Sequence, residues 1–334
     1  MPIKSNNTYG NPYHDESTGE FTSPDAASTA NANINTIVGE KAIKLKNGVT
    51  VEQIQQDLEK TKGLKKLEDE GNAIIGSKSH IVGYDPTTDI EVAKMFNLAL
   101  KQVHDMFPRL FDNELLLAYG TRAKSTATKQ DKTEAWKKVI SQEPFKSKFD
   151  SYGLDISSLQ GVLNLTENNN NDFNSGPLPP DVGGLTRSYG AALFGNQQMF
   201  HVSSVKLNET HSKSMDDWYN YAKSGEKNGS FLAVSDKSNC PLAVAAHELG
   251  HHVYGALKTF LDSNDKDALQ KMQYEGAKLF VTEKKKISRY AMTDLDEFIS
   301  ESFFDYFANG EEHATPLNTS VVKYLKGVYD KHFV

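Results

Sequence analysis

The sequence predicts an α+β fold in which long helices pack against a few short strands. Two observations carry this prediction. Apolar residues recur at helical spacing over residues 88–107 and 242–257, and short apolar runs of strand length occur at 114–120, 191–194 and 200–207. With 334 residues and 38% apolar side chains, the chain is long enough for about two compact parts and a sizeable core.

Three parts are expected along the chain. Residues 1–35 are polar and have few aliphatic side chains, so they cannot offset the entropy lost on ordering, and we expect a disordered arm. Residues 36–85 are expected to form a helical spacer, because the apolar residues between 50 and 70 make only a thin stripe. A compact domain is then predicted at 86–334, with a flexible loop rich in Asn and Pro near 166–184.

Within the compact domain, a helix is expected from Thr88 to the residue before Pro108, which cannot continue it. The run at 114–120 predicts the first strand, and the runs at 191–194 and 200–207 predict others. Thr315 and Pro316 are typical of a helix start, so a closing helix is expected near the end of the chain.

The segment His247-Glu248-Leu249-Gly250-His251 predicts a zinc site. Two histidines four residues apart share one face of a helix, and neutral imidazoles are good zinc ligands. Glu248 cannot easily reach the same ion and is therefore free to act as a general base on water. We expect the apolar run Phe231–Val234 to form a strand and Pro241 to lie in the first helical turn, so that strand, turn and helix frame the motif.

A catalytic zinc requires a third protein ligand. The pattern that places a histidine six residues after the second ligand is excluded, because that position is Leu257. Farther along, Thr293 is expected to cap a helix on which Glu297 and Glu301 lie four residues apart on one face. Glu297 is the predicted third ligand, and Glu301 is predicted to accept the spare N–H of a ligating histidine. Two solvated glutamates are the alternative, but aromatic neighbours predict that this helix is buried.

These segments resemble gluzincin metallopeptidases, particularly the group of the anthrax lethal factor catalytic domain and the Pro-Pro endopeptidases. That group reads EFFAEAF where this chain reads EFISESF from Glu297, and Tyr290 stands seven residues earlier, as in the group. Ile299 and Ser300 depart from the pattern at packing positions. The resemblance covers about the last hundred residues, and it implies that the domain at 86–334 is zincin-like, with a small twisted sheet, a backing helix, a zinc helix and a glutamate-ligand helix.

The resemblance also implies a mechanism of peptide hydrolysis. His247, His251 and Glu297 would hold Zn²⁺, Glu248 would be the general base, and the Tyr290 hydroxyl would stabilise the oxyanion. The sequence therefore predicts a zinc-dependent endopeptidase with a protein or peptide substrate.

The N-terminal arm bears on where such an enzyme acts. Residues 11–23, which include His14, Asp15 and Glu16, resemble a short "HDE-x-G-x-F" element of tailed-phage virion proteins. We therefore expect a phage-encoded, virion-associated or head-assembly peptidase that contacts virion proteins through the arm and is located in the virion or the host cytoplasm. Two alternatives stay open: a structural or adaptor virion protein that retains a peptidase fold, and a host-directed protease effector.

Charge and composition argue against other functions. The net charge is −7, and the Lys284–Lys286 run is short and isolated, so no nucleic-acid partner is expected. No run of 18 apolar residues and no signal-peptide pattern occurs, so no membrane partner is expected.

Cys240 is the only cysteine, which excludes an intramolecular disulfide. We expect Cys240 to be a small buried residue, with a thiolate latch on the zinc as the alternative. His252 points about 100° away from His251 around the helix and is expected to be structural.

Overall fold

The computed structural model describes residues 51–76, 82–111, 117–122, 177–194 and 197–333, with a few isolated positions between 137 and 150. The chain divides into two compact units, Met1–Glu59 and Lys60–Val334. The predicted arm at 1–35 lies outside the described residues. The second unit begins well before the predicted domain start at 86, because Leu64 and Leu67 of the expected spacer belong to the same core as the rest of that unit.

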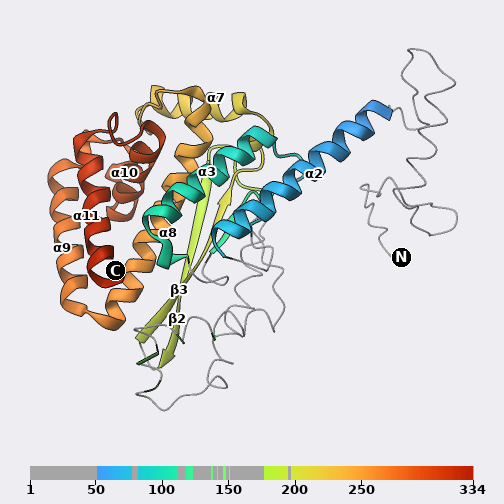
Figure 1. The fold of residues 1–334 in the computed structure, drawn as a ribbon. Coiled ribbons are helices and arrows are strands. Elements are labelled where there is room, and N and C mark those ends of the chain that lie inside the picture. Colours follow the sequence, from blue (N-terminus) through green and yellow to red (C-terminus); the bar gives the residue numbers. More distant parts are fainter. Residues whose placement is uncertain are drawn as a thin grey trace, which may run out of the picture. The chain divides into compact units, whose positions relative to one another are not determined.

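The described elements are mostly helices, with one small sheet (Figure 1). The α-helices are α2 (Val51–Ile74), α3 (Ile90–Met106), α7 (Met215–Lys227), α8 (Cys240–Asn264), α9 (Lys266–Glu283), α10 (Leu295–Asn309) and α11 (Pro316–Phe333). The strands are β1 (Leu117–Gly120), β2 (Gly184–Phe194) and β3 (Gln197–Leu207). Short 3-10 helices lie at Pro108–Leu110 (η1), His211–Lys213 (η3), Lys237–Asn239 (η4), Lys284–Lys286 (η5) and Tyr290–Met292 (η6). The mixed α+β class is therefore confirmed, while the zincin-like arrangement stays a prediction.

The sheet has the order β1-β3-β2. β2 and β3 run antiparallel, and β1 runs parallel to β3. The predicted strands at 114–120, 191–194 and 200–207 all overlap these strands, although both long strands begin earlier than expected. β2 forms one edge of the sheet, and it starts at Gly184, directly after the described part of the predicted Asn/Pro-rich loop.

The described end of that loop, residues 177–183, is tied to the end of β3. The side-chain amide of Asn208 donates to the carbonyls of Pro179 and Val182 at 2.9 and 2.6 Å. The backbone N–H of Asn208 donates to Gly183 O at 2.9 Å. These bonds hold the segment beside the first residues of β2.

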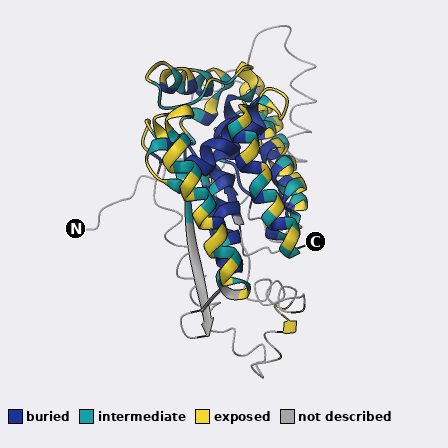
Figure 2. Cartoon of the chain, turned by 90° about the vertical axis from the view of Figure 1, so that its left-hand side faces the viewer, coloured by how far each residue is buried: buried dark blue, intermediate teal, exposed yellow. Residues whose placement is uncertain are grey.

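Helix α8 is the central element of the fold. At 1.5 Å per residue, its 25 residues span about 37 Å. It packs against α10, β3, α3 and β2, and its apolar face is buried. Figure 2 shows that the buried residues gather on the inner helices of the described part of the chain. The buried apolar residues of this face include Leu242, Ala245, Ala246, Leu249, Val253, Leu257 and Leu261. The predicted helix that carries His247 and His251 is confirmed, with Pro241 in its first turn.

The N-terminus of α10 differs from the prediction by one residue. Asp294, and not Thr293, is the N-cap: it has extended backbone dihedral angles, and its carboxylate accepts the N–H of Glu297 at 2.9 Å. Thr293 has helical dihedral angles and donates its N–H to Tyr290 O at the end of η6, so it cannot take the extended conformation of a cap. The predicted burial of α10 is confirmed from Phe298 to Ala308.

The expected strand at Phe231–Val234 is wrong, because this segment forms no ladder with another strand among the described residues. Its backbone finds other partners: the side chain of Asn309 donates to Ala233 O at 3.2 Å and accepts from Ser235 N at 3.0 Å. The Phe231 ring packs among Tyr221, Tyr290 and Phe304. Apolar composition at this position reflects core packing and not sheet formation.

The other predicted helices are present. Asp89 caps α3, which ends two residues before Pro108, and α11 starts at Pro316 as expected. A helix was also expected over 50–70, and α2 covers it. Helices α7 and α9 were not identified from the sequence, although α7 carries a recognisable N-cap, since Ser214 Oγ accepts the N–H of Asp217 at 3.1 Å.

Candidate metal centre

Helices α8 and α10 bring the three predicted ligands together. One ligand atom from each of His247, His251 and Glu297 lies within 4.8 Å of the other two. Glu297 Oε2 lies 3.1 Å from His247 Nε2 and 3.4 Å from His251 Nε2. The two histidines face the same way because they are four residues apart on α8, and Glu297 reaches them from the first turn of α10.

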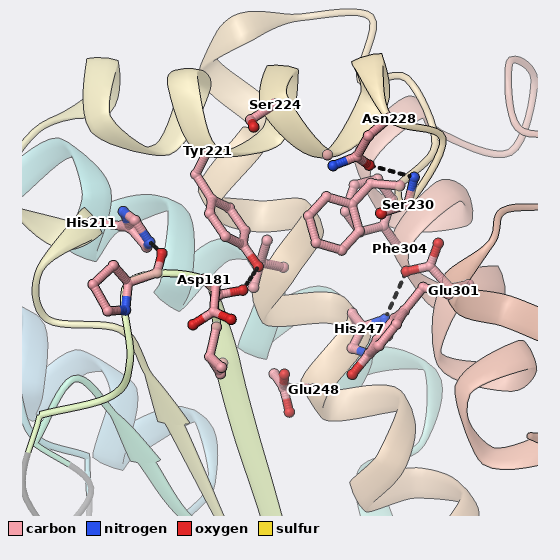
Figure 3. A pocket seen from close by; sticks show the side chains of 18 residues that line it. Asp181, His211, Tyr221, Ser224, Asn228, Ser230, His247, Glu248, Glu301 and Phe304 are labelled. Carbon is pink, nitrogen blue, oxygen red and sulfur yellow. Dashed lines mark hydrogen bonds and ion pairs between the residues drawn. The ribbon is translucent and has the colours of Figure 1, made fainter. Parts of the chain in front are cut away.

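The other imidazole nitrogen of His247 faces a fully buried carboxylate. His247 Nδ1 lies 3.1 Å from Glu301 Oε1, one turn along α10 from Glu297 (Figure 3). The second oxygen of Glu301 accepts the Ser288 hydroxyl at 2.7 Å, and Ser288 Oγ in turn accepts the N–H of Ala291 at 3.0 Å. Ser288 thus positions the Glu301 carboxylate beside His247 Nδ1, although Nδ1 and Oε1 make no hydrogen bond of good geometry among the described residues.

The charges at this centre favour a bound cation. Burial alone would lower the pKa of His247, but the carboxylates of Glu297 and Glu301 outweigh it and raise the pKa to about 10. Burial would likewise raise the pKa of Glu297, yet His247 and His251 hold it far below its usual value. The carboxylate of Glu297 is therefore ionised, and it attracts positive charge to the imidazoles.

The hydrogen bonding of Glu297 also fits a metal. Its Oε2 is buried and, within the described part of the chain, accepts no hydrogen bond of good geometry, although two imidazole nitrogens lie close by. A buried polar atom without a partner costs free energy unless an ion or another donor satisfies it. His247, His251 and Glu297 could therefore bind a metal ion.

Glu248 lies beside this group on α8 but contacts the sheet. The Thr186 hydroxyl lies 2.6 Å from Glu248 Oε2 and 3.0 Å from its backbone oxygen. Gly184 lies against the same side chain, so closely that a Cβ there would be 2.6 Å from Glu248 Cγ. The Glu248 carboxylate is thus outside the ligand group and faces the cavity described below.

Tyr290 lies next to His247, at the end of the loop that precedes α10. The two rings are stacked, with centroids 5.7 Å apart, and the Phe231 ring packs with its edge towards Tyr290. The tyrosine is 40% exposed. Burial of its ring and the negative charges of Glu297 and Glu248 raise the pKa of Tyr290 well above its usual value, so its hydroxyl keeps its proton and can donate it in a hydrogen bond.

A cavity of about 700 Å³ opens beside His247, Glu248 and Tyr290 (Figure 3). Tyr221 from α7 lines its far side, and Phe231 and Phe304 line its wall. Sequence reasoning missed Tyr221, Thr186 and the role of Phe231. The α7 cap would have indicated the helix that carries Tyr221, but the sequence contains no local signal that places Tyr221 near residues 247 and 248.

Two residues near the motif lie outside the ligand group. His252 is fully buried: its Nδ1 lies 2.6 Å from Ser203 Oγ, its Nε2 lies 3.3 Å from Leu110 O, and burial lowers its pKa to about 4. The structural role expected for it is consistent with these contacts between α8, β3 and η1. Cys240 is buried at the start of α8, and burial raises its pKa to about 11, which disfavours a thiolate.

No family model matches this chain, and no curated protein or solved structure is significantly similar to it. Among the residues that the structure describes, none of the helices combines the length and the apolar character needed to cross a bilayer. The element at 11–23 that resembles virion proteins lies outside the described residues. Function is therefore inferred from the chemistry of the site.

Proposed function

We propose that this protein is a zinc-dependent endopeptidase of the gluzincin type. The observation that carries the proposal is the convergence of His247, His251 and Glu297 next to Glu248, at the wall of a cavity large enough for a peptide side chain. Virion association and a role in head assembly stay predictions from the sequence.

The donor set supports zinc among the metals that this group could hold. Two imidazoles and one carboxylate are a common set of protein ligands at catalytic zinc. With ligand bonds of about 2.0–2.1 Å, the edge of a tetrahedral site is about 3.3 Å long. The distances of 3.1 and 3.4 Å from Glu297 Oε2 to the two imidazole nitrogens match that edge. When bound, zinc would supply Lewis-acid chemistry by polarising a peptide carbonyl and acidifying a water.

The side chains around the ligands supply the proton transfers. Glu248 accepts the proton of the attacking water and passes it to the leaving nitrogen, and such general acid–base catalysis contributes about 10²–10⁴-fold to rate. The protonated Tyr290 hydroxyl donates a hydrogen bond to the oxyanion of the tetrahedral intermediate. This role requires an O–H that keeps its proton and a position beside His247, and Tyr290 has both. With zinc bound, Glu301, whose Oε1 lies 3.1 Å from His247 Nδ1, would accept the Nδ1–H and hold the ring in one tautomer.

The test uses purified full-length protein loaded with zinc and a mixture of random peptides. New N-termini are identified by mass spectrometry for the wild type, Glu248→Gln and Glu312→Gln, in which the exposed Glu312 is a matched control outside the site. We expect cleavage by the wild type and the control but not by Glu248→Gln, with equal zinc content in all three. If the zinc-loaded wild type produces no new termini, or if Glu248→Gln produces the same ones, the proposal is wrong.

A further inference from the structure

The start of strand β2 contacts the proposed general base directly. Gly184 and Thr186 are two residues apart, so they lie on the same face of the strand. Both contact Glu248, Gly184 through its backbone and Thr186 through its hydroxyl. Strand β2 and helix α8 thus meet at Glu248, whose carboxylate is outside the ligand group.

The hydrogen bond from Thr186 has a clear direction. A threonine hydroxyl has one proton, and two oxygens of Glu248 lie within reach, Oε2 at 2.6 Å and the backbone O at 3.0 Å. The backbone oxygen lies inside α8 and already has a helical partner, whereas the carboxylate is ionised when it acts as a base. The shorter contact to the charged oxygen is the stronger of the two.

Gly184 limits Glu248 from the same side. A Cβ on Gly184 would lie 2.6 Å from both Glu248 Cγ and Glu248 Oε1, and 2.8 Å from Cδ. Contacts below 3.0 Å between these atoms are repulsive, so only glycine leaves room for the observed side-chain position. Glu248 is therefore hydrogen-bonded at Oε2 and packed against Gly184 along its stem and at Oε1.

We propose that Thr186 is a positioning residue that holds the Glu248 carboxylate in one orientation at the wall of the cavity. A glutamate side chain has several rotamers, and restricting it in advance removes that entropy loss from the catalytic step. The Thr186 hydroxyl bonds to Glu248 and not to the metal ligands, so it acts on the reaction through Glu248. This inference rests on the proposed function, because it assigns Thr186 to the same reaction.

The kinetic test compares three variants of the zinc-loaded, full-length protein on a peptide that the wild type cleaves. Thr186→Val keeps the shape and removes the hydroxyl, Thr186→Ser keeps the hydroxyl, and Leu185→Val changes the opposite face of β2 as a matched control. Loss of a hydrogen bond to a charged group predicts a kcat about 10- to 100-fold lower for Thr186→Val. KM and zinc content should be unchanged, and Thr186→Ser and Leu185→Val should keep kcat within about threefold of the wild type.

A structural readout separates this inference from the proposed function. In a crystal structure of zinc-loaded Thr186→Val, we expect Glu248 to occupy more than one rotamer, whereas the wild type and Thr186→Ser keep one. A single, unchanged Glu248 rotamer in Thr186→Val, or an unchanged kcat, overturns the positioning role while leaving the peptidase proposal intact. Absence of any cleavage by the wild type removes the peptidase proposal, and the rotamers of Glu248 still decide whether Thr186 holds it.

Discussion

Gly250 lies between His247 and His251, and its replacement tests whether the close packing of α8 against α10 sets the geometry of the candidate metal centre. A Cβ at Gly250 would lie 3.0 Å from Ser300 Cα and 3.1 Å from Phe303 Cβ on α10. Carbon atoms prefer separations of about 3.5–4.0 Å, so Gly250→Ala requires α8 and α10 to separate by a few tenths of an ångström. One partner is backbone, which cannot move aside as the end of a flexible side chain could.

The expected effects follow from that displacement. Glycine to alanine within a helix normally stabilises by about 1 kcal/mol, whereas overpacking a core costs about 1–3 kcal/mol, so a net loss of about 1 kcal/mol is expected. Metal coordination tolerates only about 0.2 Å of ligand displacement, and His251 and Glu297 lie on opposite sides of the moved interface. We therefore expect zinc affinity to fall by at least about tenfold, or 1.4 kcal/mol.

Urea unfolding of the metal-free protein measures the first effect, and competition with a zinc chelator measures the second. Gly327→Ala on α11 is the matched control, since a Cβ there meets nothing within 4 Å. The control should gain about 1 kcal/mol of stability and keep the wild-type zinc affinity. If Gly250→Ala behaves like Gly327→Ala in both assays, the close approach of the helices does not set the geometry of the site.

Three further changes probe the site and its supports. Glu301→Gln keeps the size of the side chain but weakens the hold on His247, so zinc affinity should fall about 10- to 100-fold in chelator competition. Asp294→Ala removes the α10 cap and should cost about 1 kcal/mol in urea unfolding, whereas Thr293→Ala should cost almost nothing. His252 has a pKa of about 4 in the folded protein, below its ordinary value of about 6.5, so its contribution to stability is present above pH 6.5 and is lost as the pH falls towards 4. The stability difference between the wild type and His252→Gln, which cannot be protonated, should therefore shrink over that range.

A different outcome would contradict each of these three predictions. Equal zinc affinity of Glu301→Gln and the wild type would mean that Glu301 does not orient the ligand. A larger loss from Thr293→Ala than from Asp294→Ala would restore the cap predicted from the sequence. A constant stability difference between the wild type and His252→Gln from pH 6.5 to pH 4 would mean that His252 takes up its proton equally in the folded and unfolded states.

The predictable parts of this molecule are those that depend on residues near each other in the chain. Helical periodicity and Pro241 were sufficient to locate α8, and the four-residue spacing of its histidines was sufficient to place them on one face. The start of α10 was predicted one residue early, because Thr293 and Asp294 are both good caps by composition and only the backbone of η6 decides between them. Local sequence signals thus locate a helix more accurately than they locate its first residue.

The unpredicted parts depend on contacts between distant segments. Phe231–Val234 has the composition of a strand, yet its Ala233 carbonyl accepts a hydrogen bond from Asn309, 76 residues later in the chain. Thr186 reaches Glu248 across 62 residues, and nothing in the sequence around either residue indicates that they meet. The motif therefore identifies which residues could bind a metal and act on water, whereas the alignment of Glu248 depends on β2. If that alignment limits the rate, changes at Gly184 or Thr186 will alter turnover while every residue of the motif remains in place.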